Sequence, residues 1–169
     1  MNVKKPRQAR ELSPVLLREV GGLALLALGG VAFLALLSAT QGALSDQIAL
    51  SLRRVFGWGG YPVAATLVGS GVFLLWKNLQ PELKLPWQRI VGAGIVLLAA
   101  LSISHLAAAP LPQGQALAQA GKGGGYVGWA LSYLLEVAVG RVLAYLALIT
   151  VTLAGVIIAL QPSPHNFRQ

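Results

Sequence analysis

The stretch of the chain that most resembles a chemical site is QAGKGGGYVGW, residues 119–129, where a lysine stands inside a run of glycines. Glycine-rich loops can cradle phosphates, and the Walker A form needs G-x-x-x-x-G-K followed by a Ser or Thr whose hydroxyl binds magnesium. Here Gly123 follows Lys122, and Ala116 occupies the position of the first required glycine. No strand is predicted before the stretch. The residues therefore argue against a nucleotide site, and the glycines need another explanation.

Glu136 is the only carboxylate in the long apolar stretch 126–160. A lone carboxylate, without a serine–histidine pair or metal-ligand spacing, does not assemble an active site. We therefore predict no catalytic, cofactor-binding or metal-binding residues and no enzyme activity for this chain. The expected role of Glu136 is an ion pair that pins helices together. Its candidate partners are Arg141, Arg53 and Arg54.

The composition indicates a membrane protein. Apolar residues make up 56% of the 169 residues and charged residues only 11%, whereas a soluble domain carries roughly a quarter charged residues. So few charges cannot cover a globule in water, and the lipid bilayer is the expected environment. The absence of cysteine excludes disulfides and thiolate metal sites.

Four apolar segments have the length of membrane-spanning helices. The first, Val20–Thr40, holds 21 residues without a charge, and as a helix it would measure about 31 Å, close to the roughly 30 Å of a hydrocarbon core. A signal peptide is the competing interpretation, but its apolar region would normally hold only about 7–15 residues. The stretch 126–160 is too long for one span and is expected to break near Gly140. We predict an all-α membrane protein with spans at 20–40, 59–76, 90–109 and 142–160.

The basic residues predict the orientation. The N-terminal tail holds five of the thirteen lysines and arginines, the segment 77–89 holds three and the C-terminal tail holds one. Cytoplasmic loops carry such an excess, so both termini are predicted to be cytoplasmic and the candidate ion pair to lie on the outer face. His105 and His165 then lie on opposite sides of the membrane and cannot share a metal ion.

The same pattern divides the chain into three parts. Residues 1–19 form a basic tail, residues 20–160 the membrane domain, and residues 161–169 the start of a cytoplasmic linker. The tail is interpreted as a topology signal. Direct contact with nucleic acid is the alternative, although the tail lacks the interleaved aromatic residues of a single-strand binding platform.

Two further helices are predicted before the second and fourth spans. Residues 44–56 place apolar side chains at helical spacing and lead through a corner at Gly57 into the second span, which is typical of an amphipathic helix lying in the membrane interface; a re-entrant segment is the alternative. The glycine run opens a second such helix, with a small and polar stripe every four residues. The segment APLPQGQALAQ, residues 109–119, is expected to be a loop. The two halves thus share a plan of span, interfacial helix and span, as a weak tandem repeat or by chance.

Small residues are the candidates for close helix packing, because packing replaces the hydrophobic drive between helices in lipid. The contacts would lie within one chain or between chains. The candidate positions are Gly124, Gly125, Gly128, Ser132, Gly140, Gly29, Gly30, Ala65 and Gly69.

The pattern GGYVG at 124–128, followed by ALSYLL at 130–135 and by Gly140, resembles the N-terminal membrane domain of the FtsK/SpoIIIE family of bacterial DNA translocases. The resemblance extends from Leu16 to Leu160. It implies an anchor at the division septum, assembled as a hexamer around a cytoplasmic ATPase that pumps double-stranded DNA. The chain ends nine residues after the fourth span, so the motor of such a protein is expected to lie outside this sequence.

The first hypothesis is therefore a membrane-anchoring and assembly domain that couples chromosome segregation to cell division in the bacterial inner membrane. Septal cell-division proteins would be its partners, and double-stranded DNA would be reached only through the motor domain. The alternative is a free-standing four-span transporter or channel subunit, which would need polar residues facing each other at mid-bilayer. The polar candidates within the spans are Thr66, Ser70, Ser102, Ser104, His105, Thr150 and Thr152.

Overall fold

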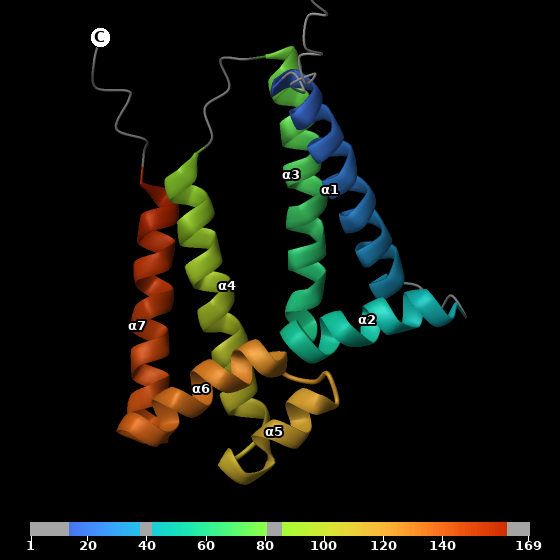
Figure 1. The fold of residues 1–169 in the computed structure, drawn as a ribbon. Coiled ribbons are helices and arrows are strands. Elements are labelled where there is room, and N and C mark those ends of the chain that lie inside the picture. The colour runs from blue at the N-terminus through green and yellow to red at the C-terminus, as the bar shows by residue number, and fades with distance from the viewer. Residues whose placement is uncertain (1–13, 38–41, 81–85, 162–169) are drawn as a thin grey trace, which may run out of the picture.

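The computed structural model describes residues 14–37, 42–80 and 86–161, and these residues form helices and short turns without any strand (Figure 1). Residues 1–13 of the predicted tail and 162–169 of the predicted linker lie outside the described residues. The helices are α1 (Pro14–Leu37), α2 (Ala43–Phe56), the 3-10 turn η1 (Gly57–Gly59), α3 (Gly60–Leu79), α4 (Trp87–Ala108), α5 (Leu111–Gln119), α6 (Gly125–Val139) and α7 (Arg141–Leu160).

Four of these helices, α1, α3, α4 and α7, are long and apolar enough to cross a membrane, which confirms the predicted all-α, four-span class. The first helix begins earlier than the predicted span, because it continues through Arg18 and Glu19 back to Pro14. Backbone hydrogen bonds do not require apolar side chains, and proline is well suited to the first helical position, where its missing N–H would have no partner. Length and apolar content thus predict the membrane crossing better than they predict the helix ends.

The long helices form two antiparallel pairs, α1 with α3 and α4 with α7, which Figure 1 shows standing side by side. Within each pair, glycine allows the backbones to approach closely. A Cβ added at Gly29 of α1 would lie 2.7 Å from the backbone nitrogen of Val68 in α3, and one added at Gly92 of α4 would lie 2.5 Å from the nitrogen of Ala159 in α7. Such contact lets dispersion between backbones hold helices together in lipid.

Shorter helices cross one end of the two pairs, which we call the junction end (Figure 1). In the first half α2 connects α1 to α3; in the second, α5 and α6 connect α4 to α7. The predicted break between α6 and α7 falls at Gly140, whose φ of 80° ends α6. Both halves therefore follow the order span, crossing helix, span, so the beginning of α1 and the end of α7 lie at the opposite, open end.

The expected loop at 109–119 is wrong, because α5 occupies Leu111–Gln119. Pro112 lies in the first turn of this helix, where proline is tolerated. Gly114 also has a packing role, since a Cβ there would lie 2.9 Å from Cδ1 of Trp129 in α6. The residues that suggested a loop instead allow a short helix to lie close beneath α6.

The outward faces of the long helices are apolar. Large exposed side chains include Leu23, Leu28 and Leu34 of α1 and Leu146, Leu153 and Ile157 of α7. Buried apolar residues form small clusters instead, such as the one that Leu36 of α1 makes with Ala49 of α2 and Ala64 of α3. A surface of this kind is stable against lipid tails and costly against water, which fits a bilayer environment.

We predict that Gly92→Ala lowers the free energy of unfolding by about 1–3 kcal/mol, because the added methyl group would overpack α4 against α7. Gly94→Ala is the matched control, since a Cβ at Gly94 meets nothing within 4 Å and alanine is the better helix former. Thermal unfolding in detergent, followed by circular dichroism, measures both. Equal effects of the two substitutions would contradict the close α4–α7 contact.

Candidate functional site

The two helix pairs are joined where the corner before α3 meets the glycine run before α6. Gly57 has a φ of 59°, and a Cβ at this position would overlap the carbonyl oxygen of Gly123. The backbone N–H of the next residue, Trp58, donates to that same oxygen at 3.2 Å. Gly125 lies equally close from the other side, because a Cβ there would meet the backbone nitrogen of Gly57. We call this set, Gly57 with Gly123–Gly125, the glycine junction.

Leu101 of α4 lies beneath the glycine junction and is fully buried. A Cβ at Gly124 would overlap its carbonyl oxygen, and a Cβ at Gly128 would lie 2.5 Å from the same atom. From the first half, a Cβ at Gly59 would lie 2.6 Å from the Leu101 side chain. Leu101 therefore contacts both halves, and a side chain at Gly59, Gly124 or Gly128 would clash with it.

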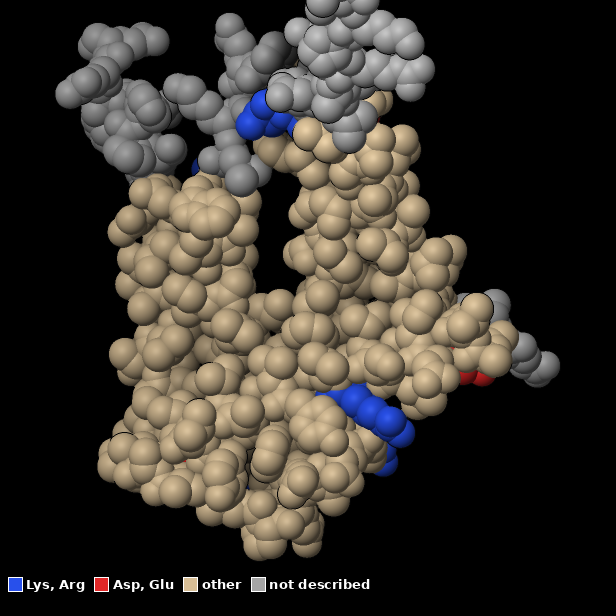
Figure 2. Space-filling view, viewed as in Figure 1, with Lys and Arg blue, Asp and Glu red and all other residues tan. Residues whose placement is uncertain are grey.

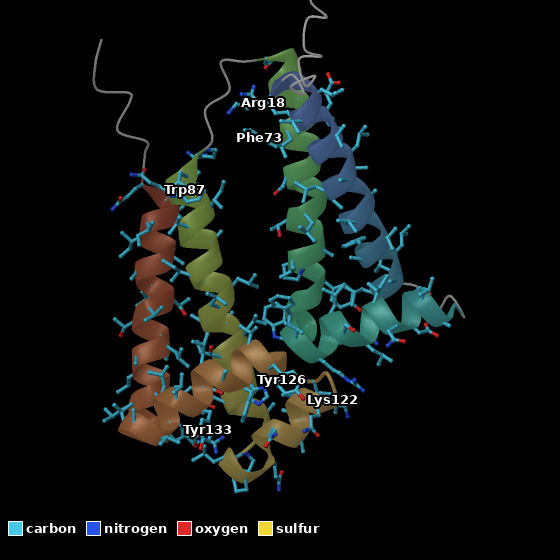
Figure 3. The ribbon with its side chains drawn as sticks, in the orientation of Figure 1. Arg18, Phe73, Trp87, Lys122, Tyr126 and Tyr133 are labelled. Carbon is cyan, nitrogen blue, oxygen red and sulfur yellow. The ribbon has the colours of Figure 1, made fainter. Side chains whose placement is uncertain are left out.

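The glycine run needs its composition for a second reason. Gly121, Gly123 and Gly125 have φ values of 68°, 58° and 62°, in the left-handed region that glycine adopts without strain. Its backbone N–H groups also have partners within the chain: Lys122 donates to Leu117 at 3.1 Å, and Gly125 donates to Lys122 at 3.2 Å. A phosphate loop would aim such groups at its ligand, whereas here they hold a turn. The Lys122 side chain is exposed beside this turn (Figure 3).

Two arginines stabilise the ends of α1 and α4 at the junction end. The Arg53 guanidinium of α2 donates to the Leu36 carbonyl at 3.1 Å, and the Tyr61 hydroxyl donates to the same oxygen at 3.1 Å. In the second half, the Arg141 guanidinium donates to the Leu106 carbonyl at 2.8 Å. The last carbonyls of a helix have no partner within the helix and carry partial negative charge, so a guanidinium is a favourable cap.

The sequence predicted an ion pair between Glu136 and one of Arg53, Arg54 and Arg141. Among the described residues no ion pair joins Glu136 to any of them, and Arg53 and Arg141 bind carbonyls instead. Glu136 lines a small pocket between α4, α5 and α6, in which His105 and Ser132 also lie. The Ser132 hydroxyl donates to the Trp129 carbonyl at 3.1 Å within α6.

His105 connects α4 to α5. It is only 2% exposed, and its Nε2 lies 3.1 Å from the carbonyl oxygen of Gly114. Because a carbonyl oxygen only accepts, Nε2 donates in this contact. Nδ1 is buried and has no hydrogen-bond partner among the described residues. Within the described residues there is no group of three or more histidines and acidic residues that could hold a metal ion.

The other candidate packing residues lie in two kinds of place. Gly29 contacts α3 as described above, whereas a Cβ at Gly30 or Gly69 would meet nothing within 4 Å. Ala65 is exposed on α3, and Gly140 forms the turn between α6 and α7.

Sequence reasoning missed Leu101 and the bond between the Trp58 indole N–H and the Ser104 hydroxyl at 2.9 Å. The glycine pair around Trp58 was the signal that pointed toward this corner.

Four lipid-length helices in two pairs, joined at one end by crossing helices, define a multi-pass α-helical membrane domain. The family described as the 4TM region of DNA translocase FtsK/SpoIIIE matches residues 42–169, and the chain belongs to this family. The matched region is a membrane region rather than a catalytic domain, and it begins just before α2, so α1 precedes it. No curated protein and no solved structure matches the chain.

We predict that Arg53→Ala lowers the free energy of unfolding by about 1–2 kcal/mol, because the Leu36 carbonyl loses a charged donor. Arg54→Ala is the matched control. Its guanidinium makes no hydrogen bond in the part of the chain that the structure describes, and it carries the same charge on the same helix. Thermal unfolding in detergent distinguishes them, and a loss of similar size in both variants would show that charge alone matters.

We predict that Gly57→Ala separates the two helix pairs, because it adds both backbone strain of about 1–3 kcal/mol and an overlap with Gly123. Gly140→Ala is the control, since Gly140 also has a positive φ but a Cβ there meets nothing within 4 Å. Spin labels on cysteines introduced at Val72 of α3 and Leu98 of α4 report the separation by pulsed electron resonance. The natural chain has no cysteine, so labelling is specific. An unchanged distance in Gly57→Ala would contradict the junction.

Proposed function

We propose that this chain is the membrane-anchoring and assembly domain of a DNA translocase that couples chromosome segregation to cell division at the septum. The observation that carries the proposal is the family match over residues 42–169. The motor of such a protein lies outside this sequence, and double-stranded DNA is reached only through it. The chain itself supplies position, by holding four helices in the bacterial inner membrane.

The hydroxyl groups within the spans support an anchor over a transporter. Thr66 and Ser70 of α3 donate to the carbonyls of Val63 and Thr66 at 2.7 Å. In α7, the hydroxyls of Thr150 and Thr152 donate to carbonyls one turn earlier at 2.9 and 2.8 Å. A transported solute would need such groups as its ligands, whereas here each hydroxyl serves its own helix.

The proposed orientation places both termini in the cytoplasm. An even number of spans brings the two ends of the chain to one side, and the basic residues Arg18, Lys77 and Arg89 belong to the helix ends on that side. Residues 1–19 then form a cytoplasmic tail, and 161–169 begin the linker to the motor. The crossing helices α2, α5 and α6 would offer the outer surface that septal proteins contact.

Assembly is the second part of the proposed role. The family resemblance implies a homo-oligomer, a hexamer in the translocases, and exposed faces of the spans would carry the contacts between chains. Gly30 suits such a contact, because the space beside it on α1 is open and small residues allow helices of neighbouring chains to approach.

We predict that a fluorescent protein fused after Gln169 accumulates at the division septum of dividing bacteria. Uniform fluorescence around the whole membrane would contradict the septal role.

For the orientation, alkaline phosphatase, which is active only outside the cytoplasm, should be active when fused after Gln119 and inactive when fused after Gln169. The reverse pattern would contradict cytoplasmic termini.

A further inference from the structure

An apolar groove runs along α3 on the side that faces the second helix pair, and the start of α4 lines one end of it. It lies between α3 and α4 and has a volume of about 960 Å³. Figure 2 shows the gap open between the pairs and closed at the junction end. The lining residues are Pro62, Ala65, Thr66, Gly69, Ser70, Phe73, Leu74, Lys77, Pro86, Trp87 and Ile90. From Pro62 to Lys77 the wall formed by α3 is about 22 Å long, at 1.5 Å per residue.

The groove walls offer few free polar groups that could bind water. Thr66 and Ser70 are the hydroxyl residues of the lining, and both donate to carbonyls of α3 itself at 2.7 Å. The remaining side chains along most of the groove are aliphatic or aromatic, and Gly69 leaves open space beside the helix. Water is stable in a cavity only where several polar partners are free, so hydrocarbon is the expected content.

One end of the groove has a different chemistry. Lys77 lines it near the end of α3, and Trp87 lines it at the start of α4. Figure 3 shows Arg18, at the beginning of α1, at this same open end of the molecule, and Figure 2 shows basic atoms at the upper rim of the gap. Tryptophan is typical of the boundary between lipid tails and headgroups. A cation at that depth fits an anionic headgroup.

We infer that the groove between α3 and α4 binds an anionic phospholipid of the leaflet at the open end. The acyl chains lie along Ala65, Gly69 and Phe73, and the phosphate group lies beside Lys77. The inference goes beyond the anchoring role, because it assigns a defined lipid site to the domain and a headgroup charge to its ligand.

The closed end favours a lipid over a helix from a second chain. A membrane-spanning helix must cross the whole hydrocarbon core of roughly 30 Å, whereas the α3 wall of the groove is about 22 Å long and Figure 2 shows the two pairs meeting at the junction end. A lipid whose headgroup lies at the open end matches the positions of Lys77 and Trp87 in the lining.

Native mass spectrometry of the full 169-residue chain tests the site. The protein is titrated with phosphatidylglycerol, which is anionic, and with phosphatidylcholine of the same acyl chains, which has no net charge. We expect the natural chain to retain phosphatidylglycerol preferentially. Lys77→Gln should reduce this preference about fivefold, the contribution of one cation near a membrane surface, and Lys77→Arg should keep it. Gly69→Leu should weaken the binding of both lipids, because its side chain fills the groove.

Matched controls separate the site from the general surface. Lys122→Gln removes an exposed cation at the junction end, and Gly21→Leu fills open space on α1 outside the groove; both should bind lipid as the natural chain does. Unfolding curves of every variant show that each is folded.

Several results would overturn the inference: Lys77→Gln keeping the preference, Gly69→Leu binding normally, or Gly21→Leu weakening binding as much as Gly69→Leu. A disulfide between two chains of the single-cysteine variant Gly69→Cys would also overturn it, because it would place a second copy in the groove.

Discussion

The two helix pairs approach each other most closely at one backbone contact, in which Gly57 lies against Gly123 and Gly125. Lipid provides no hydrophobic force that would press the pairs together, because lipid tails are as apolar as leucine. Attachment must come from very close approach and from two hydrogen bonds of Trp58, one from its backbone N–H to Gly123 and one from its indole to Ser104. Both requirements fall on the same residues, since a side chain would hold the backbones apart and would also strain a positive φ. This is the physical demand that the glycine run meets.

The same solution appears twice around that contact. In each half, an arginine from a later element reaches back to a carbonyl near the end of the first span, Arg53 to Leu36 and Arg141 to Leu106. The donor comes from α2 in the first half and from α7 in the second, so the halves are equivalent in the bond they make and not in the residue position that makes it. The two halves can therefore make the same kind of bond with little sequence similarity. A helix end can be capped by a guanidinium from any position within reach.

The spans could be predicted from sequence because membrane thickness fixes a length that can be counted along the chain. The face that each helix turns toward its neighbours could not be predicted from the sequence. Gly29 and Gly30 are adjacent and identical in type, yet only Gly29 meets α3, since the rotation of a helix depends on the whole packed pair. The arginines were matched with Glu136 because side-chain charges are visible in a sequence, whereas their observed acceptors are backbone carbonyls. Helix α5 was missed because Pro112 and Gly114 are helix breakers in isolation, and their packing beneath α6 is a tertiary effect.

The two ends of the molecule therefore have different mechanical properties. At the junction end the Trp58 indole of the first half donates to Ser104 of α4 and so links the two pairs, whereas His105 and Arg141 bond within the second half. At the open end, the apolar groove lies between α3 and the start of α4. The open end lies about 30 Å from the junction, the length of a spanning helix. A small rotation of one helix pair about the junction therefore moves its open end by a larger distance. The beginning of α1 and the end of α7 lie at this end, so a lipid bound in the groove would influence the distance between them.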